Sequence, residues 1–189
     1  MIRLRSIINI ITFPGVIIHE FAHKKYCDWT GTPVLQVCYF RLGDPQGFVV
    51  HEQPEELSAA FAISAGSLII NTLCGMALPL AAFLFNLFSW QFFMMWWIGI
   101  SAGMHAFPSN DDALNFKQQV RQHRGRISLL FLFSILFQAI IRMANALKFI
   151  WFDLWYASAI SLAGPVYFGL IPMPSFIQAI ARYAAGALR

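Results

Sequence analysis

Apolar segments long enough to cross a lipid bilayer recur along this chain and constrain its fold more than any other feature. A bilayer-spanning helix needs about 20 mostly apolar residues. Of the 189 residues, 58% are hydrophobic and only 12% are charged, whereas an ordinary soluble domain is about 25% charged. We therefore expect an all-α integral membrane protein that forms a single domain over residues 1–189. Five membrane helices are predicted, at residues 5–26, 58–88, 90–107, 127–149 and 157–171.

A β-hairpin is expected between the first two of these helices. Residues 33–52 contain two short β-prone runs that flank a turn at residues 42–47, which holds two glycines and a proline. One interpretation is a simple connection between helices; the other is an unpaired strand edge that holds a substrate peptide through main-chain hydrogen bonds. At the far end of the chain, Ser175 and Gln178 predict a capping box for a short amphipathic helix lying on the membrane.

The distribution of positive charge predicts the orientation in the membrane. The net charge of +4 is spread over short loops, which favours contact with a bilayer and argues against nucleic-acid binding. Basic residues crowd the loop after the third apolar segment, and the positive-inside tendency places that loop in the cytoplasm. The end of the first helix and residues 105–112 then reach the same, cytoplasmic face. The basic residues are Lys117, Arg121, Arg124 and Arg126.

A His-Glu-x-x-His motif at residues 19–23 lies in the first apolar segment. Because residues four apart share one face of a helix, His19 and His23 can offer two imidazoles to one metal ion. Glu20 stands beside them and can accept a proton from a metal-activated water molecule. The alternative is two buried histidines and a chance glutamate. The apolar residues 15–18 before the motif make an unpaired Glu20 costly and favour a metal site.

A third ligand is needed, because a catalytic zinc ion usually has three protein ligands and one open position for water. Residues 105–112, with the sequence His-Ala-Phe-Pro-Ser-Asn-Asp-Asp, follow the third apolar segment and are predicted to reach the face that holds the motif. This segment offers His105, Asp111 and Asp112. The residues alone leave the choice among the three open.

Polar and small residues in the other apolar segments indicate how helices pack. Asn71 needs a partner on another helix, in the metal shell or on a substrate carbonyl, and interhelical packing is the simplest of these. Gln138, Arg142 and Asn145 share one face of the fourth helix. They could line a water path to the metal, but the favoured interpretation is that Arg142 reaches the membrane interface. Residues 99–103 form a Gly-x-x-x-Gly pattern, which lets another helix approach closely.

Three segments together resemble the site-2-protease-like intramembrane zinc metalloproteases, including small prokaryotic members of that family. They are residues 19–23 near the end of the first helix, residues 66–71 in the second and residues 108–113 after the third. The resemblance implies a peptidase that hydrolyses membrane-embedded or membrane-proximal proteins. It also implies a prokaryotic cell membrane as the location, with the active site toward the cytoplasm and the lipid bilayer and a membrane protein substrate as partners.

The same resemblance assigns roles to individual residues. His19, His23 and Asp112 would hold Zn²⁺, Glu20 would act as the general base, and Asn71 would contact the substrate or the transition state. For the third ligand, Asp111 and His105 remain the alternatives to Asp112.

A second function remains open beside the peptidase. The small size of the chain and the lack of a recognition domain are also compatible with a non-catalytic, metal-binding membrane regulator or scaffold. A transporter is disfavoured because the sequence shows no inverted repeat.

Overall fold

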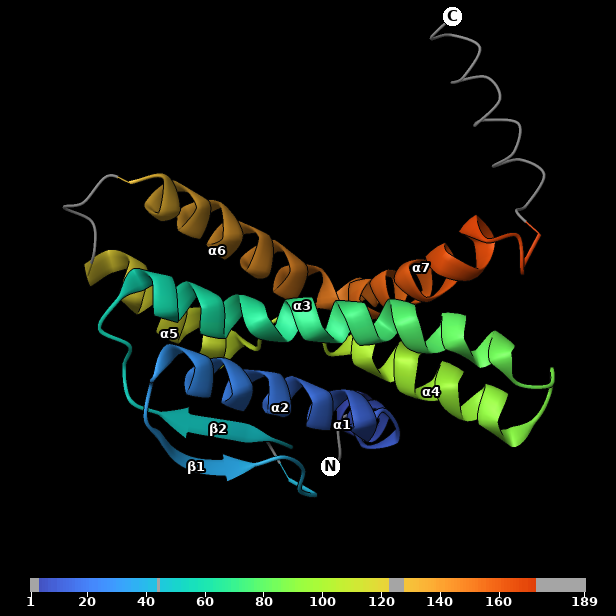
Figure 1. The fold of residues 1–189 in the computed structure, drawn as a ribbon. Helices are drawn as coiled ribbons and strands as arrows, with labels where there is room; N and C mark the ends of the chain where they lie inside the picture. Colours follow the sequence, from blue (N-terminus) through green and yellow to red (C-terminus); the bar gives the residue numbers. More distant parts are fainter. Residues whose placement is uncertain (1–3, 44, 123–127, 173–189) are drawn as a thin grey trace, which may run out of the picture.

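The computed structural model describes residues 4–43, 45–122 and 128–172. These residues are mostly helical and include one antiparallel hairpin of two strands between the first long helices (Figure 1). The predicted helical class and the predicted hairpin are confirmed, whereas the helix predicted around Ser175 and Gln178 lies outside the described residues. The elements are α1 (Leu4–Ile11), α2 (Phe13–Thr30), β1 (Val34–Cys38), β2 (Phe48–His51), α3 (Leu57–Ala81), η1 (Ala82–Leu84), α4 (Trp90–Met104), α5 (Asn110–Gln122), α6 (Leu129–Leu147), η2 (Lys148–Ile150) and α7 (Phe152–Tyr167).

Helix α3 is the central element, and the other long helices pack around it (Figure 1). Small residues permit the closest approaches. A Cβ atom on Gly99 would lie 2.5 Å from Cδ of Pro79 in α3, and one on Gly103 would lie 2.8 Å from Ala157 in α7. The predicted close approach at the Gly-x-x-x-Gly pattern is therefore confirmed, and it involves two helices rather than one.

The prediction of five membrane-spanning helices is wrong for the described part of the chain, where two helical stretches are long and apolar enough to cross a membrane. They are Leu57–Leu84 and Leu129–Ile150, and in each of them 28% of the most apolar stretch is buried. Helices α4 and α7 have 15 and 16 residues. At 1.5 Å per residue they reach about 23–24 Å, less than a hydrocarbon core of about 30 Å.

The continuous first membrane helix predicted at residues 5–26 is also wrong, because the chain breaks at Thr12. The backbone of Thr12 leaves the helical conformation, with φ −97° and ψ 28°. Its amide and its hydroxyl both donate to the carbonyl of Ile8, and its carbonyl accepts from the amide of Gly15. Pro14 lies in the first turn of α2, where its missing N–H would have no helical partner in any case. The expected kink at Pro14 is thus a boundary between two helices. Helix α2 also carries four charged side chains, Glu20, Lys24, Lys25 and Asp28.

Helix α5 occupies residues that were expected to belong to a basic loop. Phe116 and Val120 lie one turn apart on this helix and are 2% and 5% exposed. They belong to a buried apolar cluster with residues of α3 and α6, among them Leu57, Phe131 and Ile141. The apolar face buried by α5 explains why this charged segment is helical. Its packing brings the residues at its start toward α2.

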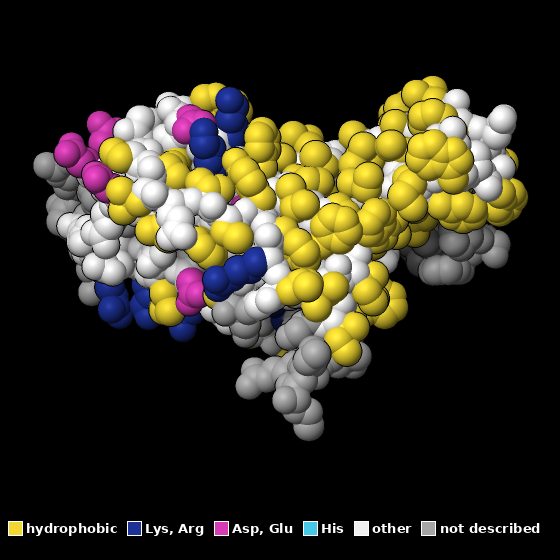
Figure 2. Space-filling view, turned by 90° about the horizontal axis from the view of Figure 1, so that it is seen from below, with side chains coloured by type: hydrophobic (Ala, Val, Ile, Leu, Met, Phe, Trp, Pro, Cys, Tyr) yellow, Lys and Arg dark blue, Asp and Glu magenta, His cyan; other side chains and the backbone are white. Residues whose placement is uncertain are grey.

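One face of the molecule has a charged half and an apolar half. Figure 2 shows hydrophobic side chains gathered over the half of the molecule that holds α4 and the end of α3, and acidic and basic side chains over the half that holds the hairpin. Large apolar side chains are also exposed on α6, including Leu132, Phe133 and Leu136. Exposed apolar area of this extent is typical of a protein that contacts lipid or another protein.

Candidate metal centre

Helix α2 places the two histidines of the motif on one buried face. His19 is 7% exposed and His23 is 5% exposed. Their Nε2 atoms lie 3.1 Å apart. Two nitrogen lone pairs at this separation repel each other unless a proton or a cation lies between them. The pair is therefore suited to share one positively charged centre.

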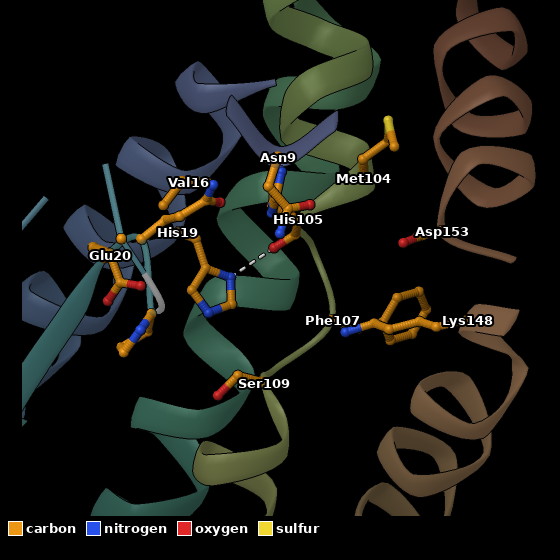
Figure 3. Close-up of a pocket in the computed structure, with 14 residues that line it drawn as sticks. Asn9, Val16, His19, Glu20, Met104, His105, Phe107, Ser109, Lys148 and Asp153 are labelled. Carbon is orange, nitrogen blue, oxygen red and sulfur yellow. Dashed lines mark hydrogen bonds between the residues drawn. The ribbon is translucent and has the colours of Figure 1, made fainter. Parts of the chain in front are cut away.

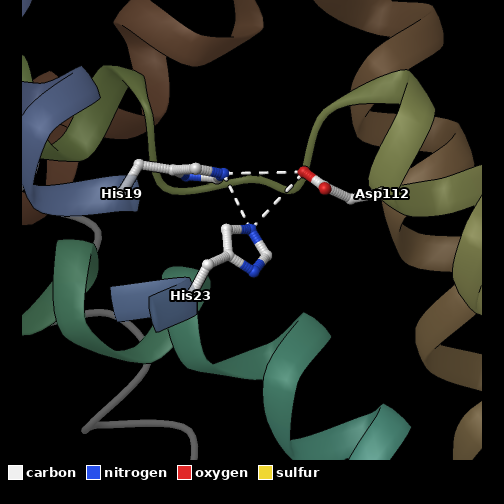
Figure 4. A group of neighbouring side chains, drawn as sticks. All are labelled: His19, His23 and Asp112. Atoms are coloured by element: carbon white, nitrogen blue, oxygen red, sulfur yellow. Dashed lines mark hydrogen bonds and ion pairs between the residues drawn. The ribbon is translucent and has the colours of Figure 1, made fainter. Parts of the chain in front are cut away.

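Asp112, the third residue of α5, completes the group from the other side. Its Oδ2 atom lies 3.6 Å from Nε2 of His19 and 3.5 Å from Nε2 of His23 (Figure 4). One donor atom from each of the three residues lies within 4.8 Å of the others. Donors about 2.0–2.1 Å from a zinc ion and separated by the tetrahedral angle lie about 3.3 Å apart. The donor types and their spacing therefore fit a zinc ion with one open position.

The carbonyl oxygen of His105 orients His19. It lies 2.6 Å from Nδ1 of His19, and because a carbonyl only accepts hydrogen bonds, Nδ1 is the donor. In the neutral ring the lone pair is then on Nε2, the atom that faces His23 and Asp112. A backbone carbonyl in this position is the usual means of fixing the tautomer of a metal-binding histidine.

Ser109, directly before α5, holds Asp112 in place. Its backbone amide and its hydroxyl both donate to Oδ2 of Asp112, at 2.9 and 2.7 Å, and the hydroxyl accepts from the amide of Asp112 at 3.1 Å. This reciprocal pair has the geometry of a capping box. The start of α5 and the position of the carboxylate are thus determined by the same hydrogen bonds.

Glu20 and His19 line a cavity of about 210 Å³ that also contacts the hairpin turn. Figure 3 shows them on one side of this cavity, with Lys148 and Asp153 on the other. Gly47 in the turn lies close to Glu20, since a Cβ atom there would be 2.6 Å from Cγ of Glu20. The absence of a side chain at Gly47 lets the hairpin close over the carboxylate.

Glu20 and Asp112, which both lie outside the two candidate membrane spans, have pKa values shifted in opposite directions. Burial raises the pKa of Glu20 to about 7; the charge of His19 opposes this and that of Asp112 adds to it. Burial would also raise the pKa of Asp112, but the charges and hydrogen bonds of His23 and His19 together hold it well below its usual range. Asp112 is therefore a carboxylate ready to bind a cation, and Glu20 is suited to exchanging a proton near neutrality.

The other two candidates for the third ligand do not join the group. Nε2 of His105 lies 2.9 Å from the hydroxyl of Thr12. Because this hydroxyl donates its proton to the carbonyl of Ile8, it accepts from Nε2 of His105. Its side chain is engaged at the break between α1 and α2. Asp111 is exposed. Of the three, only Asp112 has a carboxylate or imidazole atom within the group formed with His19 and His23.

Asn71 is buried among backbone carbonyls. Its Nδ2 atom lies 3.1 Å from the carbonyl oxygens of Gly15 and Ala102 and 3.2 Å from that of His105. The two protons on Nδ2 can serve two of these acceptors at a time. Asn71 is fully buried and lines neither cavity beside the metal group. The structure therefore shows that Asn71 connects α3 to α2 and to the end of α4 by hydrogen bonds. The predicted contact of Asn71 with substrate stays a prediction.

The polar face of α6 reaches the turn before α5 through Asn145. Its Nδ2 atom donates to the carbonyl of Pro108 at 3.1 Å. Arg142 lines a separate cavity with Lys117, between α6 and α5. The predicted water path along this face stays a prediction, whereas the role of Asn145 in holding the turn is visible.

Sequence reasoning missed three contributors to the centre: the carbonyl of His105, the side chain of Ser109 and the bare backbone of Gly47. For Ser109 a signal was present, because Ser-x-x-Asp before a helix with apolar residues one turn apart predicts an N-terminal cap. No sequence signal identifies a carbonyl or a close approach of two distant segments.

Comparison of the sequence and the structure with family models, with curated proteins and with solved structures finds no match.

Proposed function

We propose that this protein is a zinc-dependent peptidase that hydrolyses peptide bonds of membrane-embedded or membrane-proximal proteins. The observation that carries the proposal is the group of His19, His23 and Asp112, whose donor atoms lie within 4.8 Å of one another. Glu20 supports it, because it follows His19 in α2 and lines an adjoining cavity. Three ligands, an open position and a carboxylate nearby are the features of a catalytic rather than a structural zinc site.

In the proposed mechanism, the chain supplies the ligands and the proton transfers. A bound zinc ion would lower the pKa of a water molecule and polarise a peptide carbonyl. Glu20 takes the proton of the attacking water and returns it to the leaving amine. His105 keeps the ring of His19 in position during the reaction through its carbonyl. The Asp112 side chain is 29% exposed, which leaves room for water and substrate on that side.

The hairpin is proposed to hold the substrate in an extended form. A helical membrane substrate must unwind before attack, because its carbonyls are engaged in helical hydrogen bonds. Among the described residues β2 pairs with β1 alone, so its other edge has main-chain groups to offer. Val49, Val50 and His51 of β2 line a cavity that also contains His23 and Asp112. The strand edge is thus close to the metal group.

The proposed location is a prokaryotic cell membrane, with the centre toward the cytoplasm. Two helical stretches of sufficient length and apolarity support membrane association. The resemblance of residues 19–23, 66–71 and 108–113 to site-2-protease-like enzymes supports both the location and the class of substrate. The metal group lies in the half of the molecule that carries the charged side chains, which suits an opening toward water.

The test is the Glu20→Gln variant, assayed with a quenched-fluorescent peptide that contains one apolar span and is reconstituted with the protein in liposomes. Glutamine keeps the size of the side chain but cannot act as a base. We expect zinc content equal to that of the wild type and loss of cleavage. Glu55→Gln is the matched control, because Glu55 is exposed and lines neither of the two cavities beside the metal group, and it should cleave normally.

Three results distinguish the possible functions. Zinc in the wild type with cleavage that depends on Glu20 supports the peptidase. Zinc without cleavage favours the metal-binding regulator or scaffold. Cleavage that is undiminished in Glu20→Gln removes Glu20 from the mechanism.

A further inference from the structure

The cavity between α5 and α6 has a volume of about 460 Å³ and is lined by two cationic side chains, Lys117 of α5 and Arg142 of α6. None of the three metal-binding residues lines it, and no acidic residue of the described ranges does so either. Lys117 and Arg142 form no ion pair or hydrogen bond with the described part of the chain. Two positive charges therefore line one hollow without a negative charge to balance them.

Arg142 lies in an apolar setting that makes its charge costly. It is the one charged residue of α6, which belongs to the candidate span Leu129–Ile150. Ile135 and Phe149 lie about two turns before and after Arg142, on the same face, and are 44% and 77% exposed. An arginine among side chains that face lipid is stable only where its charge reaches the headgroups or finds a partner.

We infer that this cavity binds the headgroup of an anionic glycerophospholipid. Lys117 and Arg142 hold its phosphate, and its acyl chains lie along the exposed apolar face of α6. Arginine matches phosphate oxygens with two parallel N–H donors, and lysine adds a point charge. The volume suits a headgroup, because sites for small molecules occupy about 300–1,000 Å³. The inference goes beyond the proposed peptidase and does not use the metal group.

Asn145 supplies a polar acceptor in the same cavity, one turn after Arg142. Its Nδ2 atom donates to the carbonyl of Pro108, which fixes the side chain. Its Oδ1 atom is buried and has no hydrogen-bond partner among the residues that the structure describes. A headgroup that carries a hydroxyl beside its phosphate would provide the missing donor, whereas choline has neither an O–H nor an N–H group.

The test compares two lipids that have the same acyl chains. The full-length protein is purified in an uncharged detergent and mixed with phosphatidylglycerol, which has a net negative charge and free hydroxyls, or with phosphatidylcholine, which has neither. Native mass spectrometry separates the protein with and without one bound lipid and gives the Kd of each. We expect phosphatidylglycerol to bind about tenfold or more tightly, because contacts to two cations favour the anionic headgroup.

Two substitutions each remove one charge, from opposite walls, so that a folding defect in one variant leaves the other informative. Arg142→Gln and Lys117→Gln should each weaken binding of phosphatidylglycerol by about tenfold, so that most of the preference is lost. Arg121→Gln is the matched control, because Arg121 is exposed on α5 one turn after Lys117 but does not line the cavity. It removes the same charge and should bind as the wild type does.

Three results would overturn the inference. The first is a wild type that binds both lipids equally, or two cavity variants that keep the preference. The second is an equal loss in Arg121→Gln, which would show a general attraction between charges and no site. The third is complete displacement of phosphatidylglycerol by inorganic phosphate at the same concentration, which would make the cavity a site for the free anion; we expect the lipid to stay bound.

Discussion

Nδ1 of His19 lies 2.6 Å from the carbonyl oxygen of His105, a residue 86 positions later in the chain. The same carbonyl oxygen is 3.2 Å from Nδ2 of Asn71, which also reaches carbonyls of Gly15 and Ala102. The orientation of a metal-facing imidazole thus depends on contacts that join α2, α3 and α4. Positions far from the metal should therefore affect metal binding.

Asn71→Ala tests this connection. The substitution removes a buried hydrogen-bond donor, which costs about 0.5–1.5 kcal/mol, although the carbonyls of His105 and Ala102 each keep another donor. It also loosens the turn that orients His19. We expect a lower midpoint of thermal unfolding and weaker zinc binding, measured by competition with a chelator. Asn86→Ala, at an exposed asparagine, should change neither. Normal zinc affinity in a folded Asn71→Ala protein would show that this network does not support the centre.

Ser109→Ala separates helix capping from support of the metal ligand. Ser109 caps α5 and also binds Oδ2 of Asp112, whereas Ser89 caps α4 through Phe92 and has no bond to a metal-binding residue. Each substitution should cost about 1 kcal/mol in unfolding free energy. Only Ser109→Ala should also weaken zinc binding, by about tenfold or more. Equal zinc affinities in the two variants would contradict the role of Ser109.

Gly47→Ala tests the contact between the hairpin and Glu20. The added Cβ atom would lie 2.6 Å from Cγ of Glu20, so the carboxylate or the hairpin must move. We expect zinc content to stay normal and kcat to fall by about tenfold to a hundredfold, because small displacements of a catalytic group are costly. Gly43→Ala is the control in the same turn, since its nearest neighbour would be Nε of Arg41 at 3.5 Å. A kcat of Gly47→Ala equal to that of the control would count against a catalytic Glu20.

Leu136→Arg tests whether α6 lies in lipid. Leu136 is 57% exposed in the middle of the candidate span Leu129–Ile150, and an arginine at the centre of a membrane helix costs about 3 kcal/mol. The fraction of protein that resists extraction from membranes by alkaline carbonate should fall. Leu114→Arg, at a residue 61% exposed on the charged helix α5, should behave as the wild type. Equal extraction of both variants would argue that α6 is not in the membrane.

Hydropathy located most of the apolar helices but not their ends. The segment at residues 90–107 is mostly apolar, yet α4 stops at Met104 because the backbone of His105 turns away to meet His19 and Asn71. Similarly, hydropathy does not detect the break at Thr12, where the backbone leaves the helical conformation. Helix α5 escaped prediction because its apolar face is narrow and its remaining surface is charged.

The residues of the candidate site that lie close together in sequence could be predicted, whereas the residue that comes from a distant segment could not be chosen. His19 and His23 share a helix face by spacing alone. The third donor comes from a residue 89 positions after His23, and sequence left Asp112, Asp111 and His105 as alternatives. Packing of α5 against α3 distinguishes them, because it turns Asp112 toward α2 and leaves Asp111 exposed. That distinction needs three-dimensional contacts between segments distant in sequence.

The most direct test of the metal centre is the zinc content per chain of the purified protein after dialysis against metal-free buffer. The wild type and Asp111→Ala should each retain about one zinc ion, as expected for a catalytic site with three protein ligands, and Asp112→Ala should retain far less. A wild type without zinc, or an Asp112→Ala variant that retains as much as Asp111→Ala, would contradict the centre proposed for His19, His23 and Asp112.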